Sequence, residues 1–185
     1  MKATGIVRRI DDLGRVVIPK EIRRTMRIRE GDPLEIYTDR EGEVIFKKYS
    51  PIGELNTFAS QYADTLAKSG NLSVLICDRD AVIAVGGVSK KEYMDRALSK
   101  AMDEIMQQRG IYRYDSEKGE EKIYPTDDGE QFISCAMPIV SEGDVIGCVV
   151  SLQGEHGAKR DATSYDVEAK LISTAASFLG KQMES

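Results

Sequence analysis

The first fifty residues alternate apolar and polar side chains in short runs. Alternation over residues 6–10 and again over residues 16–18 predicts two short strands. Asp11 and Asp12, followed by Gly14, predict the turn between them. A tight β element is therefore expected to open the chain.

A helix and a hairpin are expected next. Pro19 suits the first turn of a helix over residues 20–27, which Gly31-Asp32-Pro33 then ends. Apolar and polar positions alternate again over residues 34–46, on either side of an acidic turn at residues 39–42, and this pattern predicts a β-hairpin.

Beyond residue 50 the hydrophobic pattern forms longer periodic segments. Ser50-Pro51-Ile52-Gly53 marks the boundary, so two domains are expected, residues 1–50 and residues 51–185. The first apolar pair of strands in the second domain is expected to form a central hairpin. The overall expectation is an α+β fold. The expected elements are a linking helix 51–69, strands 73–77 and 82–85, helix 90–109, loop 114–121, strands 132–140 and 145–152, and helix 161–183.

Charge divides the chain near the same place. Up to residue 29 there are nine Lys and Arg side chains against three acidic ones, whereas the whole chain has a formal net charge of −5. A basic head on an acidic body indicates that only the head meets a polyanion. Fifty residues with few large apolar side chains bury too little surface alone, so dimerisation of the head through shared strands is expected.

The stretch Gly5–Arg23 resembles the swapped-hairpin DNA-binding domain of AbrB-type transition-state regulators. The resemblance covers the whole head and implies that two chains interleave their hairpins into one β-barrel. MazE-type antitoxins share this fold, but the two Arg-Arg pairs and the Leu-Gly-Arg turn favour the regulators, and both branches bind DNA. The resemblance implies a DNA-facing surface made by Arg8, Arg15, Arg23 and Arg24, with Lys2, Arg9 and Lys20 as further candidates.

Arginine suits DNA contact because its planar guanidinium grips phosphate or guanine bidentately and keeps its charge at cellular pH. The alternative is a solvated charged face, which the order of turn, arginine, proline and helix disfavours. No long helix with several base-reading side chains is evident, so DNA shape and deformability are expected to carry much of the specificity. The resemblance implies A·T-rich promoter DNA as the partner.

The segment Pro138–Val150 resembles the late hairpin of GAF domains, a sensory fold with an antiparallel sheet between helices. Gly143 is expected to supply turn geometry, and Gly147 to permit close backbone approach. Head and body together resemble, over the full length, regulators of late gene expression in endospore-forming bacteria.

GAF domains often hold a small ligand against the sheet. The candidate lining segments are Cys77–Val85, Tyr93–Leu98 and Tyr114–Ser134, and none carries a cyclic-nucleotide or bilin signature. The ligand class stays open, a working sensor and a vestigial one remain alternatives, and no cofactor is expected.

The two terminal helices of the body each carry an apolar stripe. These stripes are expected to pack within the domain or against another subunit, and the second arrangement would join head dimers into a homotetramer. The stripes are Leu55, Phe58, Tyr62 and Leu66 in one helix and Val167, Leu171, Ala175, Phe178 and Leu179 in the other.

Other reactive side chains suggest little chemistry. Cys77, Cys135 and Cys148 lie in apolar strands, where a thiol is expected to be a buried small hydrophobe, although a GAF-type thiol redox enzyme of the methionine sulfoxide reductase kind is an alternative. His156 has no partner for catalysis or metal binding and is expected to be a loop residue. The acidic cluster of Asp115, Glu117, Glu120 and Glu121 is expected to be solvated, without a metal.

No apolar run approaches the roughly 20 residues that span a bilayer, and the N-terminus lacks a secretory pattern, so a cytoplasmic location is expected. The sequence therefore predicts a homo-oligomeric transcription regulator of sporulation-stage genes, an activator, a repressor or both, without catalytic residues.

Overall fold

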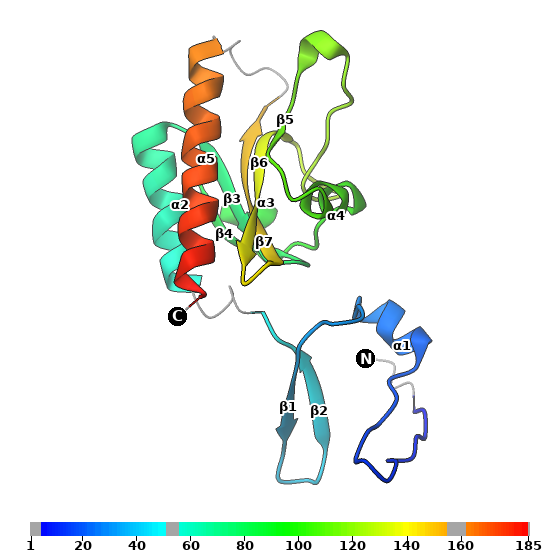
Figure 1. The fold of residues 1–185 in the computed structure, drawn as a ribbon. Helices are drawn as coiled ribbons and strands as arrows, with labels where there is room; N and C mark the ends of the chain where they lie inside the picture. Colours follow the sequence, from blue (N-terminus) through cyan, green and yellow to red (C-terminus); the bar gives the residue numbers. More distant parts are fainter. Residues whose placement is uncertain (1–4, 51–55, 155–161, 185) are drawn as a thin grey trace. The chain divides into compact units, whose positions relative to one another are not determined.

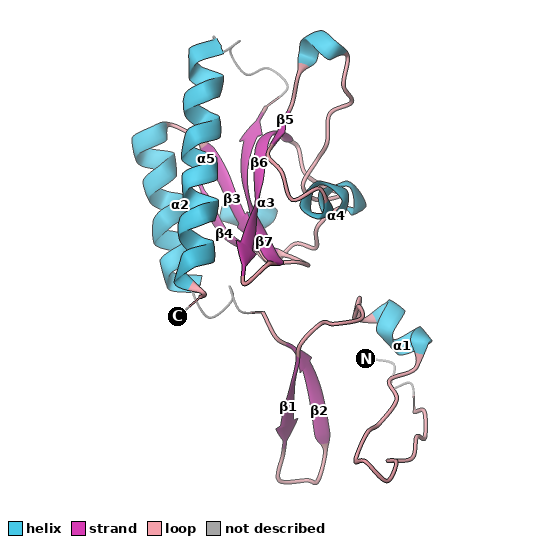
Figure 2. Cartoon of the chain, in the orientation of Figure 1, coloured by secondary structure: helices cyan, strands magenta, loops and turns pink. Residues whose placement is uncertain are grey.

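The computed structural model describes residues 5–50, 56–154 and 162–184. The chain divides into two compact units, Met1–Tyr49 and Ser50–Ser185, which we call the head and the body. Helices and antiparallel strands are mixed (Figure 2), so the α+β class is confirmed. In the ranges described, no helix has both the length and the apolar character to cross a membrane.

From residue 5 to residue 49, the head contains one short helix and one hairpin (Figure 1). Helix α1 spans Lys20–Thr25, and strands β1 (Leu34–Thr38) and β2 (Val44–Lys48) pair antiparallel. Gly42 adopts a φ of +86° in the connecting turn, a conformation that glycine reaches without steric cost. The predicted hairpin is confirmed.

Residues 6–10 and 16–18 form no strand, so the prediction of strands there is wrong for the single chain. A strand needs a neighbour to satisfy its backbone N–H and C=O groups. The described part of the head has only β1 and β2 as paired strands. The barrel implied by the resemblance takes its strands from two chains, and one chain alone forms no closed barrel.

Helix α1 ends at Thr25, two residues before the predicted end. The backbone N–H of Ile28 donates to the carbonyl of Arg23 at 2.7 Å, and that of Arg27 donates to the carbonyl of Arg24 at 3.3 Å. Arg27 lies at a φ of +51°, the left-handed position that glycine usually occupies at a helix end. The sequence therefore lacks the usual glycine signal for this end.

The head has almost no core of its own. Among residues 5–49 only Pro19 is buried. Twelve large apolar side chains of the head are exposed, by fractions that run from 38% for Phe46 to 92% for Val7. Burying such a side chain contributes about 1.5–3 kcal/mol, so the single chain leaves a large stabilising contribution unused. The exposed apolar side chains are Ile6, Val7, Ile10, Leu13, Val16, Val17, Met26, Ile36, Tyr37, Val44, Ile45 and Phe46.

The body is built on a five-stranded sheet in the order β4-β3-β7-β6-β5, with every neighbouring pair antiparallel. The two predicted hairpins are confirmed as β3–β4 and β6–β7. The first is not central, because β3 pairs with the long strand β7 and leaves β4 at the edge. The elements are α2 (Asn56–Gly70), β3 (Ser73–Cys77), β4 (Val82–Gly86), α3 (Lys90–Tyr93), α4 (Lys100–Gln107), β5 (Tyr112–Arg113), η2 (Ser116–Lys118), β6 (Phe132–Ser141), β7 (Asp144–Gln153) and α5 (Ala162–Gln182).

Apolar side chains fill both faces of this sheet. Helices α2 and α5 lie side by side on one face (Figure 1), where Ala63, Ile76 and Ile172 belong to one buried cluster. Helices α3 and α4 lie on the other face, where Leu75 and Met102 belong to a second buried cluster. The body therefore completes its core within one chain.

The predicted helix over residues 90–109 is wrong in its middle, because the chain leaves helical geometry between α3 and α4. Asp95 adopts a φ of +60°, and the backbone of residues 95–98 forms hydrogen bonds to residues 80–82 at the start of β4. Ser99 then caps α4, since its Oγ accepts a hydrogen bond from the N–H of Met102 at 3.2 Å.

The segment predicted as a loop, residues 114–121, contains a short 3-10 helix, η2. The short edge strand β5 precedes it and was not predicted. Two residues are too few to show an alternation, so the sequence carries no periodic signal for this strand.

Candidate functional site

Arg15 projects from a turn that Asp11 organises. Asp11 Oδ1 accepts hydrogen bonds from the backbone N–H groups of Leu13 at 3.0 Å and Arg15 at 2.8 Å, and Oδ2 accepts one from Arg15 Nε at 2.8 Å. The backbone N–H of Arg15 is the main cause that lowers the pKa of the Asp11 carboxyl. The Arg15 side chain remains 70% exposed.

The other predicted DNA-binding side chains are also on the surface of the head. They come from the segment before the turn and from α1. Together with the turn that carries Arg15, three adjacent segments of the head therefore carry the predicted DNA-binding side chains. Lys2 lies outside the described residues. The described candidates, all exposed, are Arg8, Arg9, Arg15, Lys20, Arg23 and Arg24.

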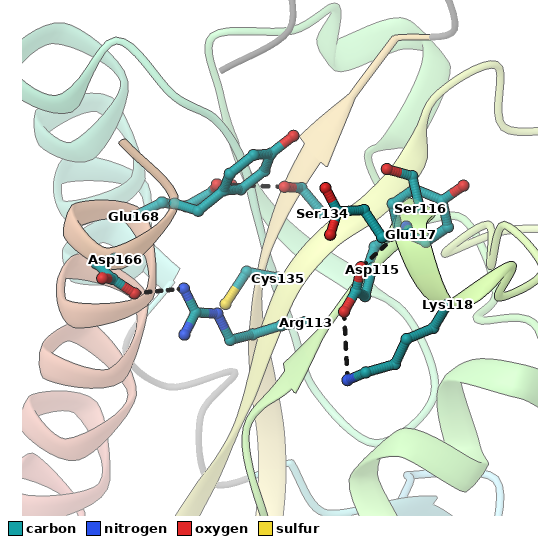
Figure 3. Close-up of a pocket in the computed structure, with 11 residues that line it drawn as sticks. Arg113, Asp115, Ser116, Glu117, Lys118, Ser134, Cys135, Asp166 and Glu168 are labelled. Carbon is teal, nitrogen blue, oxygen red and sulfur yellow. Dashed lines mark hydrogen bonds and ion pairs between the residues drawn. The ribbon is translucent and has the colours of Figure 1, made fainter. Parts of the chain in front are cut away.

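The body contains a pocket of about 560 Å³ between the start of α5, the β5–β6 edge and η2 (Figure 3). Of the three predicted lining segments, only Tyr114–Ser134 contributes to it, through residues near its two ends. Leu98 and most of the apolar side chains of Cys77–Val85 instead pack in the buried clusters. This pocket is therefore lined by α5 and the β5–β6 edge of the sheet, and not by α3 or α4.

Glu168 is a buried acidic residue of α5 that lines this pocket, with 2% of its surface exposed. Its carboxylate accepts hydrogen bonds from the hydroxyls of Ser134 on β6 at 3.2 Å and Ser151 on β7 at 2.5 Å. Sequence reasoning missed it because only the apolar members of the helix were considered. A signal was present, since Glu168 precedes the core residue Ile172 by four positions and therefore shares its helix face.

Two ion pairs line the outer part of the pocket. Arg113 Nη2 donates to Asp166 Oδ1 at 2.7 Å, and this bond is the main cause that raises the pKa of the Arg113 guanidinium. Lys118 Nζ lies 3.2 Å from Asp115 Oδ2. Figure 3 shows both pairs, with the acidic residue of the first on α5 and both partners of the second at η2.

The three cysteines are buried, and all have raised thiol pKa values. Burial is the largest cause for each, and it raises the pKa of Cys135 to about 12. The thiols of Cys77 and Cys148 have no exposed surface. Because the thiolate is the reactive form, these cysteines are unsuited to redox catalysis, and the prediction that they are buried small hydrophobes is confirmed.

The remaining polar candidates add no further chemistry. His156 lies outside the described residues. In the acidic cluster, Asp115 accepts a hydrogen bond from the backbone N–H of Glu117, the main cause that lowers the pKa of its carboxyl. Over the described ranges, no group of three or more histidine, cysteine or acidic side chains is placed to hold a metal ion.

Two family models match the chain. The model for the stage V sporulation protein T C-terminal domain, described as a transcription factor, matches residues 54–184. The model described as antidote-toxin recognition MazE, bacterial antitoxin, matches residues 7–53. The first match covers most of the body and the second most of the head.

Two relatives from Bacillus subtilis are similar in sequence. Stage V sporulation protein T is 54% identical over 184 residues, which cover 100% of this chain and 99% of the relative. The transition state regulatory protein AbrB is 51% identical over 75 residues, which cover 40% of this chain and 77% of the relative.

Solved structures share the fold of the body. The GAF domain of nlh2 from A. aeolicus is 14% identical, with a TM-score of 0.50 over 70% of this chain and 89% of the other. A type II free methionine-R-sulfoxide reductase from Thermoplasma acidophilum is 11% identical, with a TM-score of 0.51 over 71% of this chain and 94% of the other. At these identities the likeness concerns the fold alone. The full-length relative and the family match together show that this chain, with an AbrB-like head and a GAF-like body, belongs to the stage V sporulation protein T family of transcription factors, which are not enzymes.

Proposed function

We propose that this chain regulates sporulation-stage genes, as activator, repressor or both, by binding promoter DNA through a dimeric arginine-rich head. One observation carries the proposal: exposed arginines and exposed apolar side chains occupy the same small unit. The apolar side chains provide a surface for a second chain, and the arginines provide contacts for phosphates and bases. The identity with AbrB and with stage V sporulation protein T supports this assignment.

The proposed DNA surface consists of Arg8, Arg15, Arg23 and Arg24 of both chains, with Lys2, Arg9 and Lys20 at its border. Asp11 supports it by holding the turn that carries Arg15. Four arginines from each chain give up to about eight phosphate contacts, and the logarithm of the affinity then falls with the logarithm of the salt concentration with a slope near −7. A·T-rich DNA is the proposed target, read by shape.

The body is proposed to join head dimers into a tetramer through α2 and α5. Phe58 and Tyr62 of α2 each stack on Phe178 of α5, with ring centroids 5.6 Å and 5.5 Å apart. Phe178 is 37% exposed and Val167, also on α5, is 51% exposed. Part of each predicted stripe thus packs within the domain, and an outer part stays available to another subunit. Leu55 lies outside the described residues.

Fluorescence anisotropy of a labelled A·T-rich duplex tests the DNA proposal. Arg23→Ala removes one contact from each chain, so it should weaken binding and reduce the salt slope by about 2. Arg96→Ala is the matched control, because this exposed arginine lies in the body. Equal affinities and slopes for the wild type and Arg23→Ala would contradict the proposed surface.

Sedimentation equilibrium tests the assembly. Phe178→Asp places a charge on the outer surface of the two helices and should convert a tetramer into a dimer that still binds DNA. Lys181→Asp, an exposed change one turn away, is the control. A wild-type protein that remains dimeric at all concentrations would overturn this part and leave the DNA proposal intact.

The body is also proposed to sense a small ligand, and the pocket beside α5 is the proposed site. Its volume of about 560 Å³ is within the range of small-molecule sites, about 300–1,000 Å³. Occupancy would be read out through α5, because the same helix lines the pocket and carries Phe178.

A further inference from the structure

Asp11 closes the turn over residues 11–15 at both of its ends. The backbone N–H of Asp11 donates to the carbonyl of Arg15 at 3.0 Å, and Asp11 Oδ1 accepts from the backbone N–H of Arg15 at 2.8 Å. Gly14 lies between them at a φ of +76°, a left-handed conformation that glycine reaches without steric cost. Both backbone polar groups of Arg15 are therefore bonded to Asp11, which fixes where the Arg15 side chain leaves the head.

The same carboxylate also holds the guanidinium of Arg15. Asp11 Oδ2 accepts a hydrogen bond from Arg15 Nε at 2.8 Å, while the side chains of Asp11 and Arg15 are 38% and 70% exposed. The two oxygens thus have separate roles, since Oδ1 holds the backbone of the turn and Oδ2 holds the arginine side chain. Because the turn fixes the carboxylate, the direction of Arg15 is restricted before DNA binds.

The bond to Nε determines which donors of Arg15 remain for DNA. A guanidinium has five N–H donors, one on Nε and the others on the terminal nitrogens Nη1 and Nη2. The terminal nitrogens form a planar fork whose N–H groups match guanine O6 and N7, the commonest specific contact in the major groove. Asp11 therefore occupies the donor that an end-on contact by this fork leaves unused.

Charge favours a base over a phosphate as the acceptor for this fork. Arg15 and Asp11 together carry no formal net charge, and a carboxylate beside the fork repels the phosphate backbone. A hydrogen bond to a base edge depends instead on the direction of the donors, which the turn restricts. Restricting a flexible side chain in advance also lowers the entropy that is lost on binding.

We propose that Asp11 is a positioning residue that directs the terminal nitrogens of Arg15 to O6 and N7 of a guanine, so that the protein selects a G·C pair within its A·T-rich site. The inference rests on the proposed DNA surface of the head and adds base recognition to it. Asp11 acts through Arg15 and needs no contact of its own with DNA. Arg8, Arg23 and Arg24 supply the phosphate contacts.

Substitutions in the turn separate these roles. Asp11→Asn keeps Oδ1 as an acceptor for the backbone, but its amide nitrogen is a donor and cannot accept from Arg15 Nε. Asp11→Ser is a second variant at this position, because a serine hydroxyl also accepts backbone bonds in turns. Arg15→Lys keeps the charge and removes the fork. The control is Asp12→Asn, which removes the same charge from the neighbouring exposed position and none of the bonds that hold the turn.

Fluorescence anisotropy on the intact protein provides the test. Each duplex is A·T-rich and carries one G·C pair, which is moved through the site from duplex to duplex, and the reference duplex contains A·T pairs alone. At the preferred position 7-deazaguanine then replaces guanine, which exchanges the N7 acceptor for a C–H group. The quantity compared is the ratio of the affinities for the G·C duplex and the reference duplex at one salt concentration.

The wild type is expected to prefer at least one G·C position by about tenfold or more, and 7-deazaguanine should remove most of this preference. Asp11→Asn, Asp11→Ser and Arg15→Lys should each reduce the ratio by about threefold or more while binding to the reference duplex persists. Asp12→Asn should keep the wild-type ratio.

Three outcomes would overturn the inference: equal affinities for every duplex, an unchanged ratio with 7-deazaguanine, or a wild-type ratio in both Asp11 variants. Binding of the reference duplex and its weakening by Arg23→Ala test the proposed DNA surface separately. If that binding is present and the guanine preference is absent, the proposed function stands and the positioning role of Asp11 fails.

Discussion

The head and the body of this chain differ in how completely one chain can bury its apolar side chains. In the head, Pro19 is the single buried residue among residues 5–49, and twelve large apolar side chains are exposed. In the body, both faces of a five-stranded sheet are covered by helices. The comparison teaches that one chain completes the core of the body, whereas one chain buries almost none of the apolar side chains of the head.

Size and strand pairing explain the difference. An isolated two-stranded hairpin is at best marginally stable in water, and a unit of about fifty residues buries a smaller share of its surface than a larger domain does. The head has one such hairpin and a helix of 6 residues. In the body, by contrast, the two paired strands β6 and β7 are each 10 residues long, and they belong to a five-stranded sheet.

The largest effect is expected from a charge on the apolar face of the head hairpin. Ile36 is 64% exposed in one chain and lies opposite Phe46 in the hairpin. If a second chain covers this face, Ile36→Asp should abolish head dimerisation and weaken DNA binding by about a hundredfold or more. Lys47→Asp, which places an Asp on the other face of the hairpin, is the control for dimerisation. Sedimentation and anisotropy measure the two effects, and a silent Ile36→Asp would mean that the head functions as a monomer.

A substitution at a tightly packed glycine of the body should lower the stability of the body and leave head dimerisation unchanged. A Cβ on Gly147 would lie 2.2 Å from the carbonyl oxygen of Cys77, which confirms the predicted close backbone approach at this position. Gly147→Ala should therefore destabilise the body by about 1–3 kcal/mol without changing the head. Gly110→Ala is the control, because its nearest neighbour would be 3.8 Å away. Urea unfolding measures the change, and equal midpoints for the two variants would refute the tight contact.

Alkaline pH should weaken the body in particular. Burial raises the pKa of the Cys135 thiol from 9.0 to about 12, so between these values the unfolded chain has lost this proton and the folded body keeps it. The free energy of unfolding should then fall as pH rises, by about 1.4 kcal/mol per pH unit for one group. Urea unfolding from about pH 8 to about pH 11 measures the slope. Cys135→Ala should make it shallower, and identical slopes would contradict the raised pKa.

The smallest effect is expected at the pair of Arg113 and Asp166. Their side chains are 45% and 67% exposed, and surface ion pairs contribute about 0–1 kcal/mol. Asp166→Asn should therefore change the stability of the body by less than about 1 kcal/mol, with a difference that shrinks further in high salt. Thermal unfolding at two salt concentrations measures it. A larger loss would show that this pair also supports the buried Glu168 beneath it.

Much of this fold could be read from local patterns. The hairpin of the head, the pair β6–β7 and helix α5 all have strong periodicities, and their approximate bounds were predicted. The basic character of the head and the burial of Cys77 followed from residue types and their neighbours. Periodicity works here because a strand or helix repeats its own geometry along the chain.

Other features had no local signal. The break between α3 and α4 arises because residues 95–98 bond to the start of β4, and Arg27 takes a left-handed conformation without being a glycine. Two of the three segments that were expected to line a pocket, Cys77–Val85 and Tyr93–Leu98, pack largely against apolar side chains instead.

Alternation, turn residues and charge therefore specified most of the local elements and the basic character of the head. The position of the pocket and the role of Glu168 came from the packed fold. The reason is physical: a carboxylate on α5 meets the hydroxyls of Ser134 and Ser151 only after two strands and a helix, distant in the chain, have packed together. Local patterns describe each segment, whereas a site depends on which segments become neighbours.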